Sequence, residues 1–208
     1  MGRDVAIVAY AHSAMDAVSA QDEVELTQEV CRAVRQQAGL EQRAIGFTVS
    51  GSCDFISGRP FSFVSALDGV GAFPPIRESH VEMDGAFALY EAWVRLQHGD
   101  IDTALVYAFG QPSFADINRV FGLQLDPHWA VPIGLDERAV AGLQAGAARA
   151  DGRMDSSDLK RVPLRDGAAA VILAAGDVVD AYFWSTNEEC FKVSEPLLEI
   201  RHADQIRR

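Results

Sequence analysis

Short apolar runs alternate with amphipathic segments along most of this chain. A short apolar run bounded by polar residues or turn formers is typical of a buried strand. Five such runs predict strands at residues 5–10, 45–49, 80–82, 103–110 and 166–176. Residues 22–38 carry apolar side chains at helical spacing and end at Gly39, which predicts an amphipathic helix closed by a glycine. A shorter apolar helix is predicted at residues 61–67.

Residues 79–99 carry the strongest pattern in the chain. They predict a short strand, a tight turn at Asp84-Gly85 and a helix that ends at Gly99. A surface helix usually has one apolar stripe, but residues 86–96 are apolar on most sides and include only two charged side chains. We therefore expect this helix to be covered on most sides, with Phe87, Tyr90 and Trp93 in the core and part of the cover coming from outside this chain.

Residues 111–165 differ from the segments around them. They hold four prolines and one helical pattern, at residues 136–150, which predicts an excursion packed over the sheet. Strands that alternate with helices elsewhere predict an α/β fold with a mostly parallel sheet covered on both faces. After residue 176 the pattern weakens: residues 181–185 could begin a strand, and the polar tail ends in mixed charges.

Composition places the chain among ordinary globular proteins and excludes some classes of function. Its 208 residues, 49% of them hydrophobic, suffice for one large domain or two small ones with a substantial core. A net charge of -12 argues against a nucleic-acid partner, because phosphate binding relies on Lys and Arg. No apolar run approaches the ~20 residues that cross a bilayer, and no basic-then-apolar leader begins the chain. We expect a cytoplasmic protein without a membrane span.

The cysteines predict neither a metal site nor a disulfide framework. Cys31, Cys53 and Cys190 are odd in number, lie far apart and lack CxxC spacing, so we expect reduced thiols and no bound metal. Cys53 lies in a Ser- and Gly-rich turn, where a nucleophile is conceivable. No histidine lies near it in sequence to activate it, so we interpret Cys53 as a packing residue.

The turn before the central helix is the main candidate for chemistry. A strand-to-helix elbow exposes a side chain beside the free N–H groups of the helix, and many α/β enzymes place a nucleophile there. This elbow instead carries Glu82, Met83 and Asp84. In a functional interpretation one carboxylate meets a substrate hydroxyl or a water. In a structural interpretation Asp84 caps the helix, and Glu82 bonds nearby backbone or a partner subunit.

Two further side chains have both a functional and a structural interpretation. His80 precedes the elbow. In a functional interpretation it exchanges a proton with a substrate, and in a structural interpretation it is a packing residue. Arg59 has the paired donors that hold a phosphate or carboxylate, but it can equally tie its own loop to Asp54 or Asp68, which we prefer.

An aromatic-rich region lies near the two predicted short elements around residue 60. It comprises Phe55, Phe61, Phe63, Phe73 and Pro74-Pro75. These side chains would suit the wall of a pocket for a bulky substrate, and they would equally suit a dimer contact, which we consider the better interpretation.

Several of these segments resemble the thiolase superfamily, in particular its N-terminal half. The order of strand, Asp84-Gly85 helix, next strand and long loop region carries this resemblance, together with Asp166-Gly-Ala-Ala-Ala-Val-Ile-Leu173. Three segments are more similar to the lipid-transfer-protein branch, which includes bacterial retro-aldolases that shorten sterol side chains as coenzyme A thioesters. They are Ser50-Gly-Ser-Cys-Asp-Phe55, Gly58-Arg-Pro-Phe-Ser-Phe-Val-Ser-Ala-Leu-Asp-Gly-Val-Gly71 and Glu78-Ser-His-Val-Glu-Met-Asp-Gly85. The resemblance covers residues 4–176.

The resemblance implies a thiolase-like N-terminal α/β domain built from residues 1–110 and 166–176. Its sheet is expected to be mixed and five-stranded, with strand 166–174 beside strand 103–109 and helices on both faces. Residues 111–165 would be an inserted loop subdomain. Residues 177–208 would be a divergent C-terminal tail, with the second thiolase half missing.

Two departures limit the chemistry that the resemblance implies. Thiolases attack with a Cys just before the central helix, and alignment on Gly85 places Glu82 there. A carboxylate is a poor substitute for a thiolate in acyl transfer, so thiolytic chemistry is not expected. The His and Cys acid/base motifs of complete thiolases lie in the second half, so no residue of this chain can be assigned to them.

The resemblance thus implies an acyl-CoA carbon–carbon lyase of the retro-aldolase type, acting in a complex on a hydrophobic, steroid-like thioester. Glu82, Asp84 and His80 are its candidate catalytic residues. Coenzyme A enters as the thioester substrate, and no other cofactor is expected. The expected partner is a second copy, or a thiolase-like or OB-fold-containing subunit. The alternatives are a non-catalytic subunit or scaffold, and a truncated, inactive half-enzyme.

Overall fold

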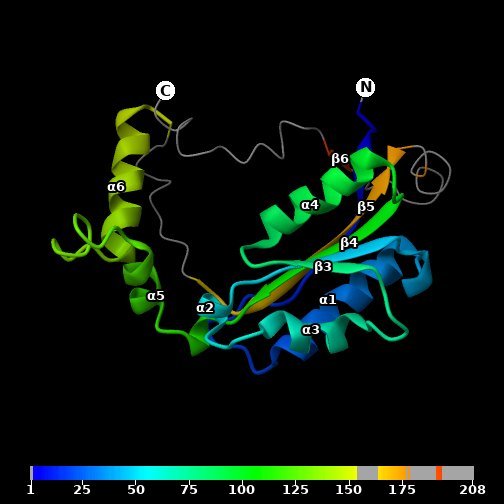
Figure 1. Cartoon of the computed structure of the whole chain (residues 1–208), viewed down its shortest axis with the longest axis horizontal. Helices are drawn as coiled ribbons and strands as arrows, with labels where there is room; N and C mark the ends of the chain where they lie inside the picture. The colour runs from blue at the N-terminus through cyan, green and yellow to red at the C-terminus, as the bar shows by residue number, and fades with distance from the viewer. Residues whose placement is uncertain (1, 154–163, 177, 179–190, 194–208) are drawn as a thin grey trace.

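A mixed sheet forms the centre of the protein (Figure 1). The computed structural model describes residues 2–153, 164–176, 178 and 191–193. Its six strands lie in the order β3-β2-β4-β5-β1-β6. They are β1 (Val5–His12), β2 (Phe47–Gly51), β3 (Glu78–Val81), β4 (Thr103–Gly110), β5 (Gly167–Ala175) and β6 (Phe191–Val193).

The pairing directions confirm a mixed sheet. Strand β2 pairs in parallel with β3 and β4, whereas β5 pairs antiparallel with both β4 and β1. Gly110 at the end of β4 lies opposite Gly167 at the start of β5. The chain thus re-enters the sheet at the edge where it left, and this makes β5 antiparallel. The predicted neighbours β4 and β5 are confirmed, and the prediction of mostly parallel pairing is wrong.

Strand β6 was not predicted. It pairs antiparallel with β1, so residues 191–193 of the predicted tail join the sheet. The strand suggested at residues 181–185 lies outside the described residues.

Helices cover both faces of the sheet, as predicted. Helices α1 (Glu23–Ala38) and α3 (Ser62–Val70) lie on one face, and α4 (Gly85–His98) lies on the other (Figure 1). Local signals set the ends of α1: Asp22 and Glu25 form a capping box, and Gly39 adopts the left-handed conformation at the carboxyl end. The prediction for residues 22–38 is confirmed.

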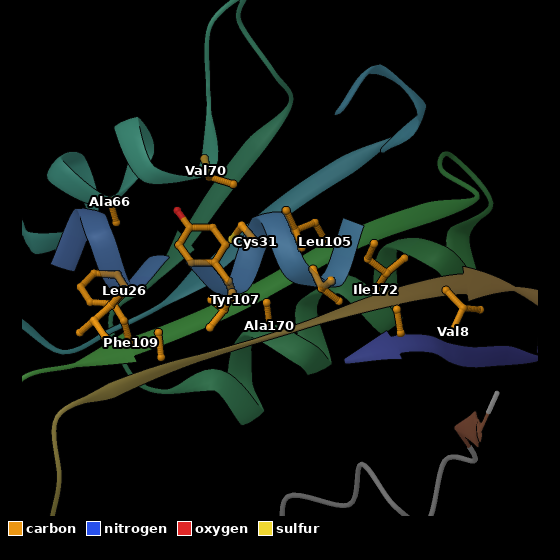
Figure 2. Close-up of a cluster of buried hydrophobic side chains, with 14 of the residues drawn as sticks. Val8, Leu26, Cys31, Ala66, Val70, Leu105, Tyr107, Phe109, Ala170 and Ile172 are labelled. Carbon is orange, nitrogen blue, oxygen red and sulfur yellow. The ribbon is translucent and has the colours of Figure 1, made fainter. Parts of the chain in front are cut away.

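The larger core lies between α1, α3 and the sheet. Figure 2 shows Leu105, Tyr107 and Phe109 of β4 directed toward Leu26 and Cys31 of α1. All five side chains are buried. Burial of each large apolar side chain stabilises the fold by about 1.5–3 kcal/mol, so this face anchors the strands that lead to the candidate site.

Among the described residues, helix α4 is covered along one face, which packs against the sheet. Ala88, Ala92 and Leu96 are buried against β2 and β4. On the outer side Tyr90 is 44% exposed and stacks on Trp93, with ring centroids 6.1 Å apart. The expectation that Tyr90 belongs to the core is therefore wrong for the single chain. Small residues on the inner face let α4 approach the sheet closely, and they leave the large side chains outside.

The excursion after β4 lies beyond one end of the sheet, near the short helix α2 (Asp54–Ser57), rather than over its faces (Figure 1). It comprises a 3-10 turn, η2 (Pro112–Phe114), the unpredicted helix α5 (Ile117–Gln124) and the predicted helix α6 (Glu137–Ala150). Another 3-10 turn, η1 (Gln42–Ala44), precedes β2. Among the helices of the described residues, none has the length and apolar character needed to cross a membrane.

Candidate active site

A pocket of about 270 Å³ lies where β2 and β4 end and β5 begins. Parallel strands bring their carboxyl ends to one edge of a sheet, and α/β proteins commonly bind ligands there. Most of the lining is apolar or glycine. It consists of Met15, Gly51, Cys53, Ile56, Ser57, Met83, Asp84, Gly85, Ala108, Phe109, Gly110, Gly167, Ala168 and Ala169.

Two glycines let the elbow before α4 sit directly against the strands. A Cβ at Gly51 would lie 2.6 Å from the carbonyl carbon of Asp84, and a Cβ at Gly85 would lie 2.9 Å from Cβ of Ala108. Both distances are shorter than real Cβ contacts allow. The absence of side chains at Gly51 and Gly85 thus places Asp84 at the pocket wall.

Asp84 is both the cap of α4 and part of the pocket. Its Oδ1 accepts hydrogen bonds from the N–H groups of Ala86 at 2.9 Å and Phe87 at 3.2 Å. A cap of this kind typically contributes about 0.5–2 kcal/mol to stability. Among the described residues, no donor contacts its second oxygen, Oδ2. The cap therefore leaves one carboxylate oxygen for a ligand.

Glu82 lies beside the pocket, and both of its oxygens are engaged. Oε1 accepts a hydrogen bond from the backbone N–H of Asp54 at 2.7 Å, and Oε2 lies 3.1 Å from Nε2 of His80. Glu82 is not among the lining residues. The structural interpretation, in which Glu82 bonds nearby backbone, thus describes its contacts.

His80 is held on three sides. Its Nδ1 lies 2.9 Å from Oγ of Ser50, its Nε2 faces Glu82, and its ring stacks on Phe63 with centroids 4.3 Å apart. The imidazole is 12% exposed. The structure therefore joins two of the three sequence-predicted candidates, His80 and Glu82, and leaves Asp84 alone at the pocket.

Sequence reasoning discounted Cys53 and did not consider Met83 as a lining residue. Both line the pocket, and Cys53 is a half-buried free thiol. Cys53 follows Gly51, the last residue of β2, by two positions. Its place after a buried strand is the signal that could have put it at this edge of the sheet. Cys31 is different, because burial among apolar side chains raises the pKa of its thiol to about 12.

Arg59 has a structural role, as preferred, but with other partners than predicted. Its guanidinium lies 2.6 Å from Glu23 at the start of α1 and stacks over Phe114, 4.6 Å from the ring centroid. Asp54 instead accepts hydrogen bonds from the Phe61 N–H and from the N–H and hydroxyl of Ser62. The predicted tie of the Arg59 side chain to Asp54 or Asp68 is wrong, because the guanidinium pairs with Glu23 and the Asp54 carboxylate is engaged within its own loop. Arg59 contacts Asp54 only through the backbone, where its N–H donates to the Asp54 carbonyl at 3.2 Å.

The aromatic-rich region does not form one cluster. Phe55, Phe61 and Phe73 are 66%, 68% and 91% exposed, whereas Phe63 packs on His80. Ile56, rather than Phe55, lines the pocket from α2. Among the described residues, no group of three or more His, Cys, Asp or Glu side chains is placed to hold a metal ion.

Comparison with solved structures places this arrangement among known folds. The chain superposes on that of an Ltp2–ChsH2(DUF35) aldolase with a TM-score of 0.58 and 15% identity, over 84% of this chain and 56% of the aldolase chain. The chain also superposes on human mitochondrial 3-ketoacyl-CoA thiolase in complex with CoA. The TM-score is 0.54 and the identity 12%, over 86% of this chain and 66% of the thiolase chain. The chain has a thiolase-like fold.

Comparison of the sequence with family models and curated proteins found no relative of this chain. The chain spans less than two thirds of the length of either solved structure. At 15% and 12% identity the superpositions establish the fold alone.

Proposed function

We propose that this chain supplies the N-terminal half-fold and part of the pocket of an acyl-CoA carbon–carbon lyase of the retro-aldolase type. Its substrate would be a β-hydroxyacyl-CoA thioester with a hydrophobic, steroid-like acyl group. The observation that carries the proposal is the position of Asp84, which lines a largely apolar pocket, caps α4 through Oδ1 and has no donor at Oδ2 among the described residues. The likeness to a solved aldolase supports the choice of reaction class.

The proposed reaction needs one base and one site for an enolate. Asp84 takes the proton of the β-hydroxyl, the bond between Cα and Cβ breaks, and its electron pair forms the thioester enolate. Protonation of Cα, with the proton returned by Asp84, then gives a shortened acyl-CoA and a free ketone. Gly85 lines the pocket at the first turn of α4, so its N–H is our candidate donor to the enolate oxygen.

The base is assigned to Asp84 rather than to Glu82 because of their contacts. Both oxygens of Glu82 already accept hydrogen bonds, from Asp54 and from His80. A base must reach the substrate hydroxyl directly or through one water. Glu82 and His80 then act as positioning residues, which hold the segment before the elbow through the backbone of Asp54.

The size of the pocket supports action within a complex. Ligand pockets usually measure about 300–1,000 Å³. A volume of about 270 Å³ accommodates the reacting end of a thioester but not a steroid together with coenzyme A. The outer face of α4, with Tyr90 44% exposed, offers a surface for the missing cover. We propose a thiolase-like or DUF35-type, OB-fold-containing subunit, or a second copy of the chain, as the partner.

The decisive experiment separates the two roles of Asp84, as the N-cap of α4 and as the catalytic base. Asp84→Asn keeps an N-cap of similar strength but removes the base, whereas Asp84→Ala removes both. In a purified complex given a β-hydroxyacyl-CoA thioester, we expect Asp84→Asn to lower kcat by about 100-fold or more with unchanged thermal stability. Mass spectrometry of the released ketone and shortened acyl-CoA measures turnover.

Asp68→Asn is the matched control, because Asp68 is an exposed carboxylate on α3 outside the pocket lining. It should leave kcat and stability unchanged. Full activity of Asp84→Asn would remove Asp84 as the base. Absence of turnover by the wild-type complex with each candidate partner would overturn the lyase proposal itself.

A non-catalytic subunit is the second candidate, and the contacts of Glu82 favour it. The residue in the position of the thiolase nucleophile is fully used in holding the Asp54 loop. In that case the complex forms, but its activity does not respond to Asp84→Asn or Glu82→Gln. Tyr90→Ser, on the exposed face of α4, should then weaken the complex while the isolated chain remains folded.

A further inference from the structure

A second, larger cleft lies at the opposite end of β2 from the candidate active site. Its volume is about 790 Å³, within the range of sites for small molecules. Ile45 and Gly46, which precede β2, line it, whereas Gly51, which ends β2, lines the first pocket. The rest of the lining comes from the end of α1, from η1 and from the loop before β3, namely Arg35, Glu41, Gln42, Arg43, Gly71, Phe73, Pro74, Pro75, Ile76 and Arg77.

The charge of this cleft is opposite to that of the chain. The whole protein has 30 acidic residues against 18 Lys and Arg, yet the cleft has three arginines and one carboxylate. Glu41 pairs with Arg43 at 2.7 Å. Arg77 is exposed; its backbone carbonyl accepts a hydrogen bond from the N–H of Thr48, but among the described residues its guanidinium has no ion pair or hydrogen bond. A guanidinium without a protein partner at a concave site is suited to a carboxylate or phosphate.

Gln42 provides a second, independent indication that the cleft binds a ligand with hydrogen-bond acceptors. Its Oε1 accepts a hydrogen bond from the guanidinium of Arg35, and since Arg can only donate, this contact assigns the amide orientation. The Nε2 atom is buried and has no hydrogen-bond partner among the described residues. A buried donor without an acceptor is costly. Gln42 lines the cleft, and its terminal amide torsion is soft, so the amide can reorient to donate to a ligand bound there.

The other wall of the cleft is apolar and open to solvent. Phe73 is 91% exposed, and Pro74, Pro75 and Ile76 follow it around the rim. An exposed aromatic ring next to a guanidinium can stack on a flat apolar group while the guanidinium binds an attached anion. The cleft thus combines the two kinds of contact that such a ligand needs.

We propose that this cleft binds a small organic anion, a carboxylate or phosphate attached to an apolar or aromatic body. Arg77 and Arg35 face the anionic group, Gln42 donates to one of its oxygens, and Phe73 with the two prolines covers the body. The site is separate from the proposed lyase pocket, and its test does not depend on that activity.

The test uses the full chain with 2-naphthoate as the probe and 2-naphthylmethanol as its uncharged counterpart. Titration followed by ¹H–¹⁵N NMR reports both affinity and the residues affected. We expect saturable binding of 2-naphthoate, about tenfold or more tighter than 2-naphthylmethanol, with amide shifts at residues 71–73, 76 and 77. Both Arg77→Gln and Phe73→Ser should weaken the binding of 2-naphthoate by about fivefold or more.

Arg149→Gln is the matched control, because Arg149 is an exposed arginine on α6 outside the cleft. It should leave the affinity unchanged. Arg77 and Phe73 are exposed, so their variants should keep the fold, and the NMR spectra show whether they do. Equal affinity for the two probes, no saturable binding, or affinity that is indifferent to Arg77→Gln and Phe73→Ser would overturn the proposal.

Discussion

Oγ of Ser50 lies 2.9 Å from Nδ1 of His80, and the opposite ring nitrogen of His80 faces the carboxylate of Glu82 at 3.1 Å. A carboxylate only accepts hydrogen bonds, so Nε2 must carry the proton. In the neutral ring Nδ1 is then an acceptor, and the Ser50 hydroxyl donates to it. This chain of contacts orients Glu82 toward the backbone of Asp54 and so links β2 to the elbow.

The first prediction concerns the tautomer of His80. Long-range ¹H–¹⁵N NMR of the neutral imidazole should show the proton on Nε2. Ser50→Ala removes the donor to Nδ1 and should change the Nδ1 shift, while His98, exposed at the end of α4, keeps its own. A dominant Nδ1–H form in the wild-type protein would contradict the assignment.

The second prediction concerns the contact between β2 and the elbow. A Cβ at Gly51 would lie 2.6 Å from the carbonyl carbon of Asp84, so Gly51→Ala must push the elbow away from the strand. We expect it to lower the free energy of unfolding by about 1–3 kcal/mol, as overpacking usually does. Urea denaturation measures this change.

Gly142→Ala is the control for that substitution. Apart from the adjoining backbone of α6, no atom of the described residues lies within 4 Å of a Cβ at Gly142, and an alanine in a helix interior is favoured over glycine. This variant should be unchanged or more stable. Equal effects of the two substitutions would show that the elbow is not held against Gly51.

The third prediction concerns the two described thiols. In a Cys190→Ser background, Cys53 should react with a thiol reagent in the folded protein, because it is half-buried at a pocket. Cys31 should react only after unfolding, since it is fully buried and its pKa is raised to about 12. Cys53→Ser should abolish the fast phase, and fast labelling that persists in this variant would contradict the assignment.

The fourth prediction concerns Asp54 and acid. Burial alone would raise the pKa of Asp54, but hydrogen bonds from Ser62 and Phe61 and the charge of His80 outweigh it, so the pKa is lowered from 3.8. A carboxylate with a lowered folded-state pKa contributes stability that is present above its unfolded pKa and is lost as the pH falls through the folded value. Stability should therefore fall as the pH drops below about 4.

Urea midpoints measured across acid pH test this dependence. Asp54→Asn should flatten the acid limb, because the group that titrates is gone. Asp68→Asn removes an exposed carboxylate on α3 and should leave the limb unchanged. The same slope in wild type and Asp54→Asn would assign the acid sensitivity to other groups.

Local signals explain most of what could be predicted about the elements. The capping box of α1, the Asp84 cap and the glycines after α1 and α4 act within a few residues of one another, so sequence spacing suffices. Helix α5 was not predicted because it has only eight residues and lies in a proline-containing segment whose pattern indicates loops. The direction of β5 depends on the edge of the sheet at which the chain re-enters after residues 111–165, and a local sequence pattern does not predict that edge.

The candidate site was predictable in place but not in detail. Asp84, Glu82 and His80 lie close in sequence, so each was a candidate at the elbow. Which carboxylate stays open depends on Asp54, because its N–H engages Glu82 across 28 positions of sequence. The position of Cys53 at the pocket depends likewise on the alignment of β2 with β4.

The sequence by itself determined the α/β class, the central helix with its ends, and the elbow that carries two carboxylates. These follow from the spacing of apolar residues and from caps, which act over a single turn or strand. Only the tertiary structure decided that Asp84 faces the pocket, that Glu82 is engaged and that a basic cleft lies at the far end of β2. Contacts between distant segments decide these features, because burial and hydrogen bonding depend on which segments meet.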